Sequence, residues 1–362
     1  DFHLRRTALI GAFWQKEPTE TIAPSPRSEE HRTPSSKISE NNRLNKYNKW
    51  IDTAGNNEFS AQARFQNEFF YVNSKPKFLF NKDDGFFGIG SCFARNIEHS
   101  LKECNLNCLT DGIKIPAGYY NQDRDPRAAM NKFNIPSMID EINRTFGGSK
   151  DESARYIEIS EHAFFDTATS GIDLLSLDKH AEVKAEIARV FRRLADANAV
   201  FITLGLVEMW LDNKTGLYLN TSPHPTAMRQ EIRAEKASLG TYTNRFVHMR
   251  PNFMFLREKM HEFVNLLLVH APKAKLVVTV SPIPLQTTMT SDDVVASSTL
   301  SKCLLRAVAE DARESFDHVD YFPSYEMVMN SRRDATWATD AVHVTDHIVK
   351  QITDGFINEW IV

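Results

Sequence analysis

The sequence has 362 residues and a mass of 41.3 kDa, enough for about two ordinary domains or for one large domain with extensions. Apolar residues make up 42% of the chain and charged residues 25%, which excludes a wholly disordered or collagen-like protein. The formal net charge of −4 gives no long-range field that would attract nucleic acid or an anionic membrane. Apolar runs are far shorter than the ~20 residues of a membrane-spanning helix, so we expect a soluble protein without nucleic-acid or membrane partners.

The cysteines point to a reducing environment. There are four, Cys92, Cys104, Cys108 and Cys303, too few and too irregularly spaced for a disulfide framework. Cys104 and Cys108 are spaced so that they could share a helix face, but no second Cys or His pair completes a metal site, and we interpret both as small buried hydrophobic residues. Free thiols are typical of a reducing compartment, so we expect a cytoplasmic location. The chain opens at Asp1 rather than Met, which leaves room for a targeting segment or further residues before it.

The first part of the chain differs in composition from the rest. Residues 17–45 are dense in Ser, Thr, Glu, Asn, Arg and Pro, with almost nothing apolar to bury. Such a composition cannot offset the entropy lost when a chain becomes ordered. We therefore expect residues 1–70 to form a polar arm, partly extended or mobile, and residues 71–362 to form one α/β domain.

From about Pro76 onwards, short apolar strands alternate with amphipathic helices. The predicted strands are 86–90, 199–204, 275–280 and 318–322, and the predicted helices are 93–102, 135–142, 178–197, 253–270, 300–314 and 345–361. This alternation predicts parallel strands with helices on both faces of the sheet. Ligands bind at the carboxyl ends of the strands in such a sheet, so the residues that follow each strand are the candidates for a functional site.

Polar and nucleophilic residues occupy these positions. The segments are Gly90-Ser91-Cys92, Gly205-Leu206-Val207-Glu208, Ser281-Pro282-Ile283-Pro284 and, before the last helix, Asp340-Ala341-Val342-His343. Each segment alone is a weak signal. Together, in this order, they predict a hydrolytic site at one edge of the sheet.

Ser91 and Cys92 are the candidate nucleophiles. A nucleophile at a strand-to-helix turn stands on a tight bend that a glycine relieves, here Gly90. It also stands at a helix N-terminus, where backbone N–H groups favour a thiolate or an oxyanion. Local sequence alone favours a structural interpretation, in which Ser91 is a helix N-cap beside a buried cysteine.

Asp340 and His343 shift the balance towards catalysis. A carboxylate three residues before a histidine can orient the imidazole ring and stabilise its protonated form while the ring reaches a nucleophile. The chain has 12 histidines, so a surface Asp beside a helix-capping His also arises by chance. The position of the pair, directly before the last helix, is what favours a function.

The segment Gly90-Ser91-Cys92-Phe93-Ala94 resembles the name-giving motif of the GSCFA-domain family, which belongs to the SGNH/GDSL hydrolase-like superfamily. The resemblance runs from about Pro76 to the C-terminus and leaves the N-terminal arm outside. Supporting segments are Thr203-Leu204-Gly205 with Glu208 and Trp210, Thr279-Val280-Ser281-Pro282, residues 321–326, and Asp340 with His343. The resemblance implies a three-layer α/β/α sandwich with a mainly parallel, flavodoxin-like sheet.

The resemblance also implies residue roles. Asp340 and His343 match the C-terminal DxxH block, which supplies the acid and base of a triad. SGNH enzymes carry their nucleophile in a Gly-Asp-Ser motif, and Gly90-Ser91-Cys92 aligned on it without a gap makes Cys92 the nucleophile. With a shift of one residue the nucleophile is Ser91. We favour Cys92, because its register needs no gap and a thiol paired with a histidine is easily activated.

One departure from the superfamily concerns the oxyanion. The third superfamily block, GxND, carries a donating Asn after its glycine, whereas this sequence has Val207 after Gly205. Such a donor stabilises the transition state by about 3 kcal/mol in a known hydrolase. We expect the backbone N–H of Cys92, with that of Asn134 or Gly118, to take its place.

A second departure is Glu208. A carboxylate beside the pocket could bind a substrate hydroxyl or amine, but we favour a structural ion pair with an arginine such as Arg95. Trp210 and the segment 321–326 are expected to pack in the core.

These residues predict an acyl-ester hydrolase or an O-acyltransferase that acts on an acylated carbohydrate or small molecule. It would use a Cys/Ser-His-Asp triad without a metal or cofactor, and the glycine-rich loops of nucleotide-binding proteins are missing from the sequence. The alternative is a catalytically silent module of the same fold that binds a glycan or a protein partner, which the valine at 207 favours. A thiol-based redox enzyme, with Cys104 or Cys108 as resolving partner, is a weaker third possibility.

Overall fold

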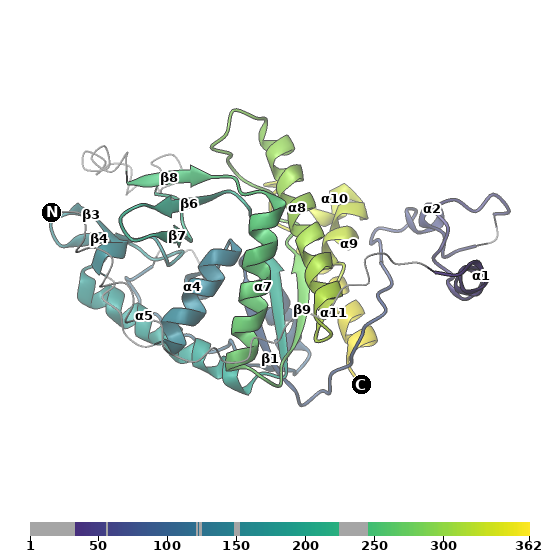
Figure 1. Ribbon diagram of the computed structural model, residues 1–362, viewed down its shortest axis with the longest axis horizontal. Helices are drawn as coiled ribbons and strands as arrows, with labels where there is room; N and C mark the ends of the chain where they lie inside the picture. The colour runs from purple at the N-terminus through teal and green to yellow at the C-terminus, as the bar shows by residue number, and fades with distance from the viewer. Residues whose placement is uncertain (1–32, 56, 121, 123–124, 148–152, 224–244) are drawn as a thin grey trace, which may run out of the picture.

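The computed structural model of the protein describes residues 33–55, 57–120, 122, 125–147, 153–223 and 245–362. Figure 1 shows a central sheet between layers of helices, with the first two helices to one side of this body. The α/β class and the parallel sheet that the sequence predicts are confirmed.

The central sheet has five parallel strands in the order β2–β1–β5–β9–β10. Their bounds are Gly85–Gly90 (β1), Asn107–Cys108 (β2), Ala199–Leu204 (β5), Lys275–Val280 (β9) and Val319–Tyr321 (β10). β1, β5 and β10 are buried along their whole length, and β9 is buried after its first residue. Near-continuous apolar strands of this kind are expected where helices cover both faces of a parallel sheet.

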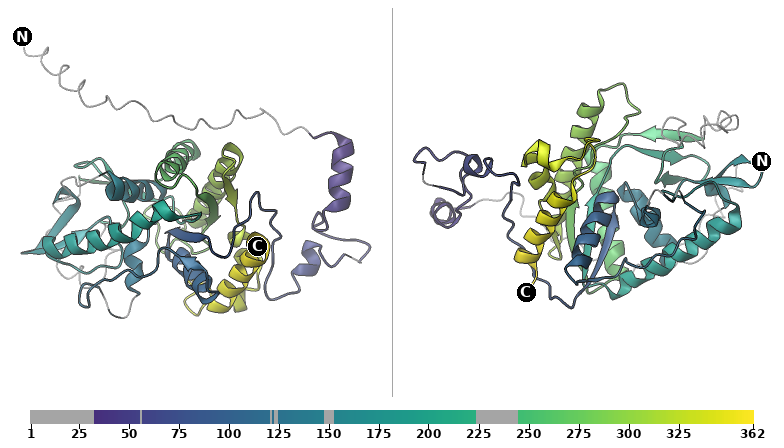
Figure 2. Two further views of the ribbon diagram at one scale, coloured as in Figure 1. Left: turned by 90° about the horizontal axis from the view of Figure 1, so that it is seen from below. Right: turned by 180° about the vertical axis from the view of Figure 1, so that it is seen from behind.

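Two helical layers cover the sheet, as Figures 1 and 2 show. One face packs on α4 (Ile135–Phe146), α5 (Leu177–Phe191), α7 (Phe253–His270) and α8 (Val294–Ser315). The other face packs on α3 (Cys92–Glu103), α9 (Ser324–Asn330) and α11 (Asp346–Trp360). Alternate residues of β1 serve the two cores, with Phe87 and Ile89 on the first face and Phe86 on the second.

Smaller elements complete the body. β3 (Tyr156–Ser160) and β4 (Ala163–Asp166) form a hairpin, and β6 (Met209–Asp212) pairs antiparallel with both β7 (Leu217–Leu219) and β8 (Phe246–Met249). Short helical turns are η1 (Pro126–Met130), η2 (Ser153–Arg155), η3 (Arg192–Asp196) and α10 (Arg333–Thr336).

The N-terminal region differs in part from the expected arm. Within the segment 17–45, which we expected to be extended or mobile, α1 forms a helix over Ser35–Leu44, and α2 follows the segment over Ala61–Arg64. No residue of α1 is buried, so its helix rests on local propensity rather than on packing. The chain docks on the body from Glu68, whose carbonyl accepts a hydrogen bond from the backbone N–H of Arg332. Residues 1–32 lie outside the described part of the chain.

Most predicted elements occur where the sequence places them. The helix predicted from residue 300 begins earlier, at Val294, because Asp293 caps it by accepting a hydrogen bond from the Val295 N–H. Cys104 and Cys108 do not share a helix, since Cys104 caps the end of α3 and Cys108 lies in β2. Cys108 is buried, as expected, whereas Cys104 is partly exposed.

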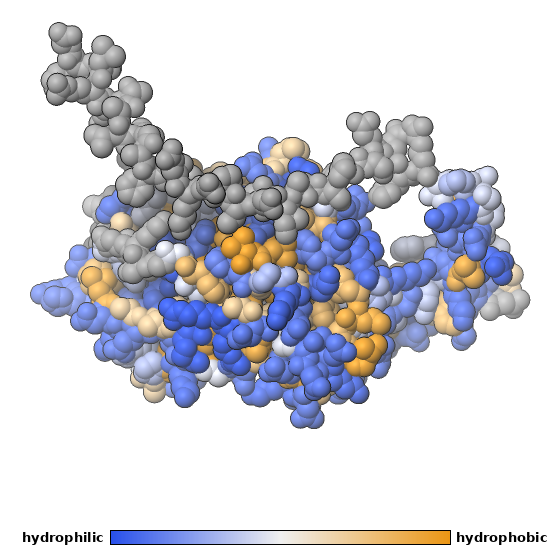
Figure 3. All heavy atoms as spheres, turned by 60° about the horizontal axis from the view of Figure 1, so that its bottom comes forward, coloured by the Kyte–Doolittle hydropathy of each residue, from blue (hydrophilic) through white to orange (hydrophobic). Residues whose placement is uncertain are grey.

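The face of the molecule shown in Figure 3 is largely hydrophilic where it is not grey, with apolar side chains in several groups. Exposed apolar residues of this kind are normal on globular proteins. Among the helices in the described part of the chain, none combines the length and apolar character needed to cross a membrane.

Candidate functional site

The strand order creates a crevice at the carboxyl ends of β1 and β5. From β1 the chain continues to one side of the sheet, into β2, whereas from β5 it continues to the other side, into β9 and β10. The helix that follows β1, α3, therefore lies on one face of the sheet, whereas α7, which connects β5 to β9, lies on the opposite face. Such a switch point is where open α/β sheets bind ligands. The residues that follow the two strands are Ser91 and Cys92, and Gly205 to Val207.

The turn after β1 requires glycine at position 90. Gly90 has φ +146°, and a Cβ on it would lie 2.4 Å from the carbonyl oxygen of Thr203 in β5. The Gly90 carbonyl accepts a hydrogen bond from the Lys132 N–H at 2.8 Å. Backbone atoms of Thr203 and Lys132 therefore lie against the bend, and the space beside Gly90 does not admit a side chain.

Ser91 is the N-cap residue of α3 but makes no capping hydrogen bond with its side chain. The residue is 4% exposed, and its hydroxyl has no hydrogen-bond partner among the described residues. A buried hydroxyl without a partner is destabilising, so the N-cap interpretation does not account for this serine.

Cys92 is the first residue of α3, and the backbone N–H groups of Phe93 and of Cys92 itself act to lower the pKa of its thiol. Burial is the largest influence on the thiol and raises its pKa, against these N–H groups and the positive charges of Lys302 and Arg95, which lower it. Cys92 as a residue is partly exposed.

Lys302 of α8 lies at the same crevice, which the sequence analysis did not predict. Its Nζ donates a hydrogen bond of 2.8 Å to the Gly205 carbonyl, and the residue is 3% exposed. Burial lowers the pKa of this lysine to about 7, while interaction with Cys92 raises it. A signal was present in the sequence, because Lys302 stands three residues before Leu305, on the apolar face of its helix.

Asn134 lies at the crevice because residues 132–134 cross both strand ends. Beside the contact of Lys132 with Gly90, the Phe133 carbonyl accepts the N–H of Leu206 at 2.8 Å. The amide side chain of Asn134 is engaged, since its oxygen accepts from the Ser137 N–H and its nitrogen donates to the Leu219 carbonyl. It therefore caps α4.

The loop after β5 is tightly packed. A Cβ on Gly205 would lie 2.9 Å from the Phe133 carbonyl oxygen and 3.5 Å from the Cβ of Ser91. Val207 is buried, and its N–H donates to the Ser301 hydroxyl of α8 at 3.1 Å. Gly205 thus lies between Ser91 and the Lys302 amine.

Asp340 and His343 form the dyad that their spacing predicts. Asp340 Oδ2 lies 2.6 Å from His343 Nδ1, and Oδ1 accepts the N–H groups of Val342 and His343. These hydrogen bonds, led by that of the imidazole, hold the pKa of the Asp340 carboxyl far below its usual range. Both side chains are about half exposed, and Ala341 between them takes φ +56° to close the loop.

The course of α11 places this dyad at the same edge of the sheet as Cys92. The Trp360 carbonyl, at the end of α11, accepts from the N–H of Phe80, which lies just before the amino end of β1. α11 has 15 residues and is therefore about 22 Å long. α11 packs along α3 in the second core, and its C-terminal end lies near the amino end of β1. The first turn of α11, which closely follows His343, therefore lies towards the carboxyl edge of the sheet. In the described structure no hydrogen bond joins the His343 ring to Ser91 or Cys92.

Comparison with protein families assigns this chain. Residues 85–356, which include both the strand-end segments and the Asp340–His343 loop, match the GSCFA family. The chain belongs to the GSCFA family. A comparison with curated proteins finds no match. The placement of the family among the SGNH hydrolases stays a prediction.

Gly118 and Glu208 were also predicted for the site, and the structure shows the contacts that each of them makes. Gly118 is exposed at φ +86°, in a turn whose next residue, Tyr119, bonds Glu182 of α5 through its hydroxyl. None of the hydrogen bonds in the described structure links Gly118 to Ser91 or Cys92.

Glu208 is held in the domain by a structural network, but the predicted partner is wrong. Its carboxylate accepts from the Thr288 hydroxyl at 2.7 Å and the Met289 N–H at 3.1 Å, and lies 3.3 Å from His248 Nε2. Arg95 instead pairs with Glu98, one helical turn away on α3, at 3.0 Å. Gly88 leaves the space for this buried pair, since a Cβ there would lie 2.0 Å from a Glu98 oxygen.

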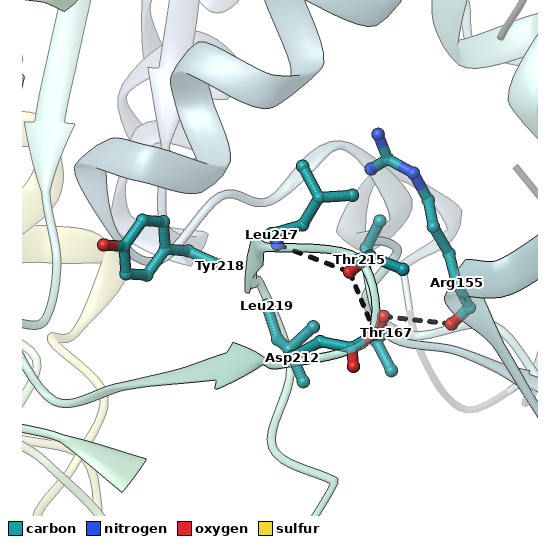
Figure 4. Close-up of a pocket in the computed structure, with 8 residues that line it drawn as sticks. Arg155, Thr167, Asp212, Thr215, Leu217, Tyr218 and Leu219 are labelled. Atoms are coloured by element: carbon teal, nitrogen blue, oxygen red, sulfur yellow. Dashed lines mark hydrogen bonds between the residues drawn. The ribbon is translucent and has the colours of Figure 1, made fainter. Parts of the chain in front are cut away.

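A small hollow, with room for about one water molecule, is shown in Figure 4. It is lined by Arg155, Thr167, Ala168, Asp212, Thr215, Leu217, Tyr218 and Leu219. The Asp212 carboxylate in it is already bound by Arg245, by Thr215 and by the Lys214 N–H. None of the predicted nucleophiles or bases lines this pocket. Within the described residues, no three His, Cys, Asp or Glu side chains are grouped to hold a metal ion.

Proposed function

We propose that this GSCFA protein is an acyl-ester hydrolase or an O-acyltransferase, with Cys92 as the nucleophile that carries the acyl group. The observation that carries the proposal is the position of this thiol. Cys92 is a partly exposed residue at the N-terminus of α3 and at the switch point of the sheet. The backbone N–H groups of Cys92 and Phe93 act to lower the pKa of its thiol. Backbone N–H groups at a helix N-terminus stabilise a thiolate and the negative charge that develops on a carbonyl oxygen.

The Asp340–His343 dyad supplies the general base. Because Asp340 Oδ2 lies at the Nδ1 atom, it favours the tautomer with the proton on Nδ1, which leaves a lone pair on Nε2 for proton transfer. The ring is about half exposed at the same edge of the sheet. It is therefore in a position to serve an acceptor that arrives from solvent, either water or a hydroxyl of a carbohydrate.

The substrate class follows the superfamily that the motif resembles: an acylated carbohydrate or a small acyl ester. In this scheme the ester carbonyl carbon is attacked by Cys92, an alcohol leaves, and the acyl group passes to the acceptor. Neither step requires a cofactor for its atoms or electrons to balance.

The test is covalent trapping on the full chain. Incubation with p-nitrophenyl esters and with a fluorophosphonate probe should give a mass increase that peptide mapping assigns to residue 92. The adduct should disappear in Cys92→Ala and persist in Cys303→Ala, which removes an exposed thiol that does not take part. Labelling that persists in Cys92→Ala but is lost in Ser91→Ala would assign the nucleophile to Ser91.

A binding module without catalytic activity is the second candidate, and Val207 favours it. This residue is buried and apolar where the superfamily has a donating side chain, and its own N–H is used by Ser301. If no ester or fluorophosphonate labels the wild-type chain while a glycan array does give specific binding, this candidate replaces the enzyme.

A further inference from the structure

Three lysines are buried among the described residues, and one of them differs from the others. Lys132 pairs with Glu141 at 2.7 Å, and Lys184 pairs with Asp166 at 3.0 Å. Lys302 is as deeply buried, but no carboxylate of the described structure lies within ion-pair distance of it. Burying an ammonium group without a counter-charge is strongly unfavourable, so a lysine in this setting calls for a reason other than stability.

Lys302 interacts with a backbone carbonyl and with the charge of one ionisable group, the Cys92 thiol. Its Nζ donates to the Gly205 carbonyl, which cannot accept charge or give up a proton. The ionisable group that acts on Lys302 is the Cys92 thiol of α3, and Lys302 acts in turn on Cys92. Arg95, one turn further along α3, is the other cation that acts on the thiol, and it is neutralised by Glu98.

We propose that Lys302 is the base that takes the proton of the Cys92 thiol when the sulfur attacks an acyl carbon, a step that rests on the proposed function. The assignment rests on three observations. The amine is fixed on Gly205, which lies against Ser91, the residue before the thiol. It is buried without a carboxylate partner, and it comes from α8, on the opposite helical layer from α3, so the crevice separates the two groups.

The protonation states of the two groups fit this role. Burial lowers the pKa of Lys302 to about 7 and raises the pKa of Cys92. Both effects favour the uncharged amine beside the uncharged thiol near neutral pH. An uncharged amine is a base, whereas the ordinary ammonium form of lysine is not.

The acylation step then balances. The S–H bond of Cys92 breaks and an N–H bond forms on Lys302, while the sulfur forms a bond to the ester carbonyl carbon. As the tetrahedral intermediate collapses, the C–O bond to the alcohol breaks and the leaving oxygen takes the proton from the Lys302 ammonium. The products are an acyl thioester on Cys92, a free alcohol and a neutral lysine. This division leaves His343 to activate the acceptor in the second step.

Alkylation of Cys92 tests the proposal without any ester. Iodoacetamide modification would be followed by peptide mass spectrometry from pH 5.5 to 9.5, with the exposed Cys303 of the same molecules as the reference thiol. Lys302→Met removes the amine, and Lys302→Gln keeps an N–H donor for Gly205 but cannot accept a proton. Both variants should slow alkylation of Cys92 at pH 7 by roughly tenfold or more, which corresponds to a shift of at least one pH unit in the profile.

The matched control is Ser301→Ala on the same helix. It removes the hydroxyl that accepts the Val207 N–H but leaves the amine, and it should keep the wild-type pH profile. A Lys302→Gln profile that superimposes on the wild type would overturn the proposal, because the hydrogen bond to Gly205 would then be the whole role of the lysine.

Single-turnover acylation with a p-nitrophenyl ester separates this inference from the proposed function. We expect both Lys302 variants to form the thioester at least tenfold more slowly, and His343→Ala to form it and then fail to release it. Acylation of both Lys302 variants at the wild-type rate would refute the inference while the enzyme stands. Lys302-dependent alkylation in a chain that no ester acylates would refute the enzyme while the Cys92–Lys302 pairing stands.

Discussion

Replacing Lys302 by methionine should make the protein more stable, although it removes a group of the proposed site. The lysine is 3% exposed and has one hydrogen bond, to Gly205. Methionine is unbranched and of similar length, so it fills the same space without an amine to desolvate. The expected gain in the free energy of unfolding depends on pH, and its sign and size follow from the pKa of the lysine.

Burial lowers the pKa of Lys302 from 10.5 to about 7, a difference worth about 5 kcal/mol. Between these pH values the unfolded chain binds more protons at this residue than the folded chain, so stability rises with pH there. Below pH 7 the full penalty acts, and by pH 9 only about 2 kcal/mol of it remains. The lost hydrogen bond to Gly205 offsets about 1 kcal/mol. At pH 7 itself about 4 kcal/mol of the penalty acts. The free energy of unfolding of Lys302→Met should therefore exceed that of the wild type by about 3 kcal/mol at pH 7 and by about 1 kcal/mol at pH 9.

Equilibrium urea unfolding of both proteins at pH 7, 8 and 9 measures this difference. Lys184→Met is the matched control, because it leaves the buried Asp166 carboxylate without its ion pair and should lower stability by roughly 3 kcal/mol or more. Two results would refute the reasoning: a Lys302→Met variant less stable than the wild type at pH 7, or a difference in the free energy of unfolding that does not shrink towards pH 9. Either result would mean that the lysine has a counter-charge.

Three further predictions concern the turn after β1, the dyad and Glu208. Gly90→Ala should prevent stable folding, measured by circular dichroism, because the added Cβ would overlap the Thr203 carbonyl at a φ that alanine avoids; a stable, fully folded variant would show that β1 and β5 can move apart. Asp340→Asn should slow ester turnover by roughly two orders of magnitude or more, since it no longer fixes the His343 tautomer; an unchanged rate would exclude the dyad from the reaction. Glu208→Gln should leave trapping of Cys92 within about twofold but lower stability by about 1 kcal/mol, because it weakens hydrogen bonds to the 288–289 loop; loss of trapping would make Glu208 part of the site.

The sequence was sufficient to predict the elements that are periodic and apolar. Residues 199–204 and 275–280 were predicted as strands at the bounds that the structure shows, because buried parallel strands are unbroken apolar runs. The Asp340–His343 dyad was predicted as well. With a spacing of three residues, the Asp340 carboxylate contacts both the backbone N–H and the ring of His343 within one loop. Both features depend on interactions that are local in sequence or on burial alone.

Partners that are distant in sequence were not predictable. Glu208 was expected to pair with Arg95, but a glutamate on the next helical turn reaches that arginine first. The helix at 35–44 was missed because its polar composition resembles that of a disordered segment. Nothing local distinguishes Lys302 from Lys132 and Lys184, because the three differ only in whether the fold brings a carboxylate to them.

The five residues of the GSCFA segment divide according to whether packing explains them. Gly90 is required by its backbone angle and by the nearby Thr203. Phe93 and Ala94 lie on the buried face of α3, at 0% and 2% exposure. Ser91 makes no capping hydrogen bond, and its buried hydroxyl has no partner among the described residues. Cys92 is partly exposed, and its thiol interacts electrostatically with Lys302, a lysine without a carboxylate partner in the described structure. Stability alone would select a capping serine, an apolar residue at 92 and an apolar residue at 302. The fold thus retains three unfavourable choices around one crevice, and a reaction at the Cys92 sulfur is what would give all three a common purpose.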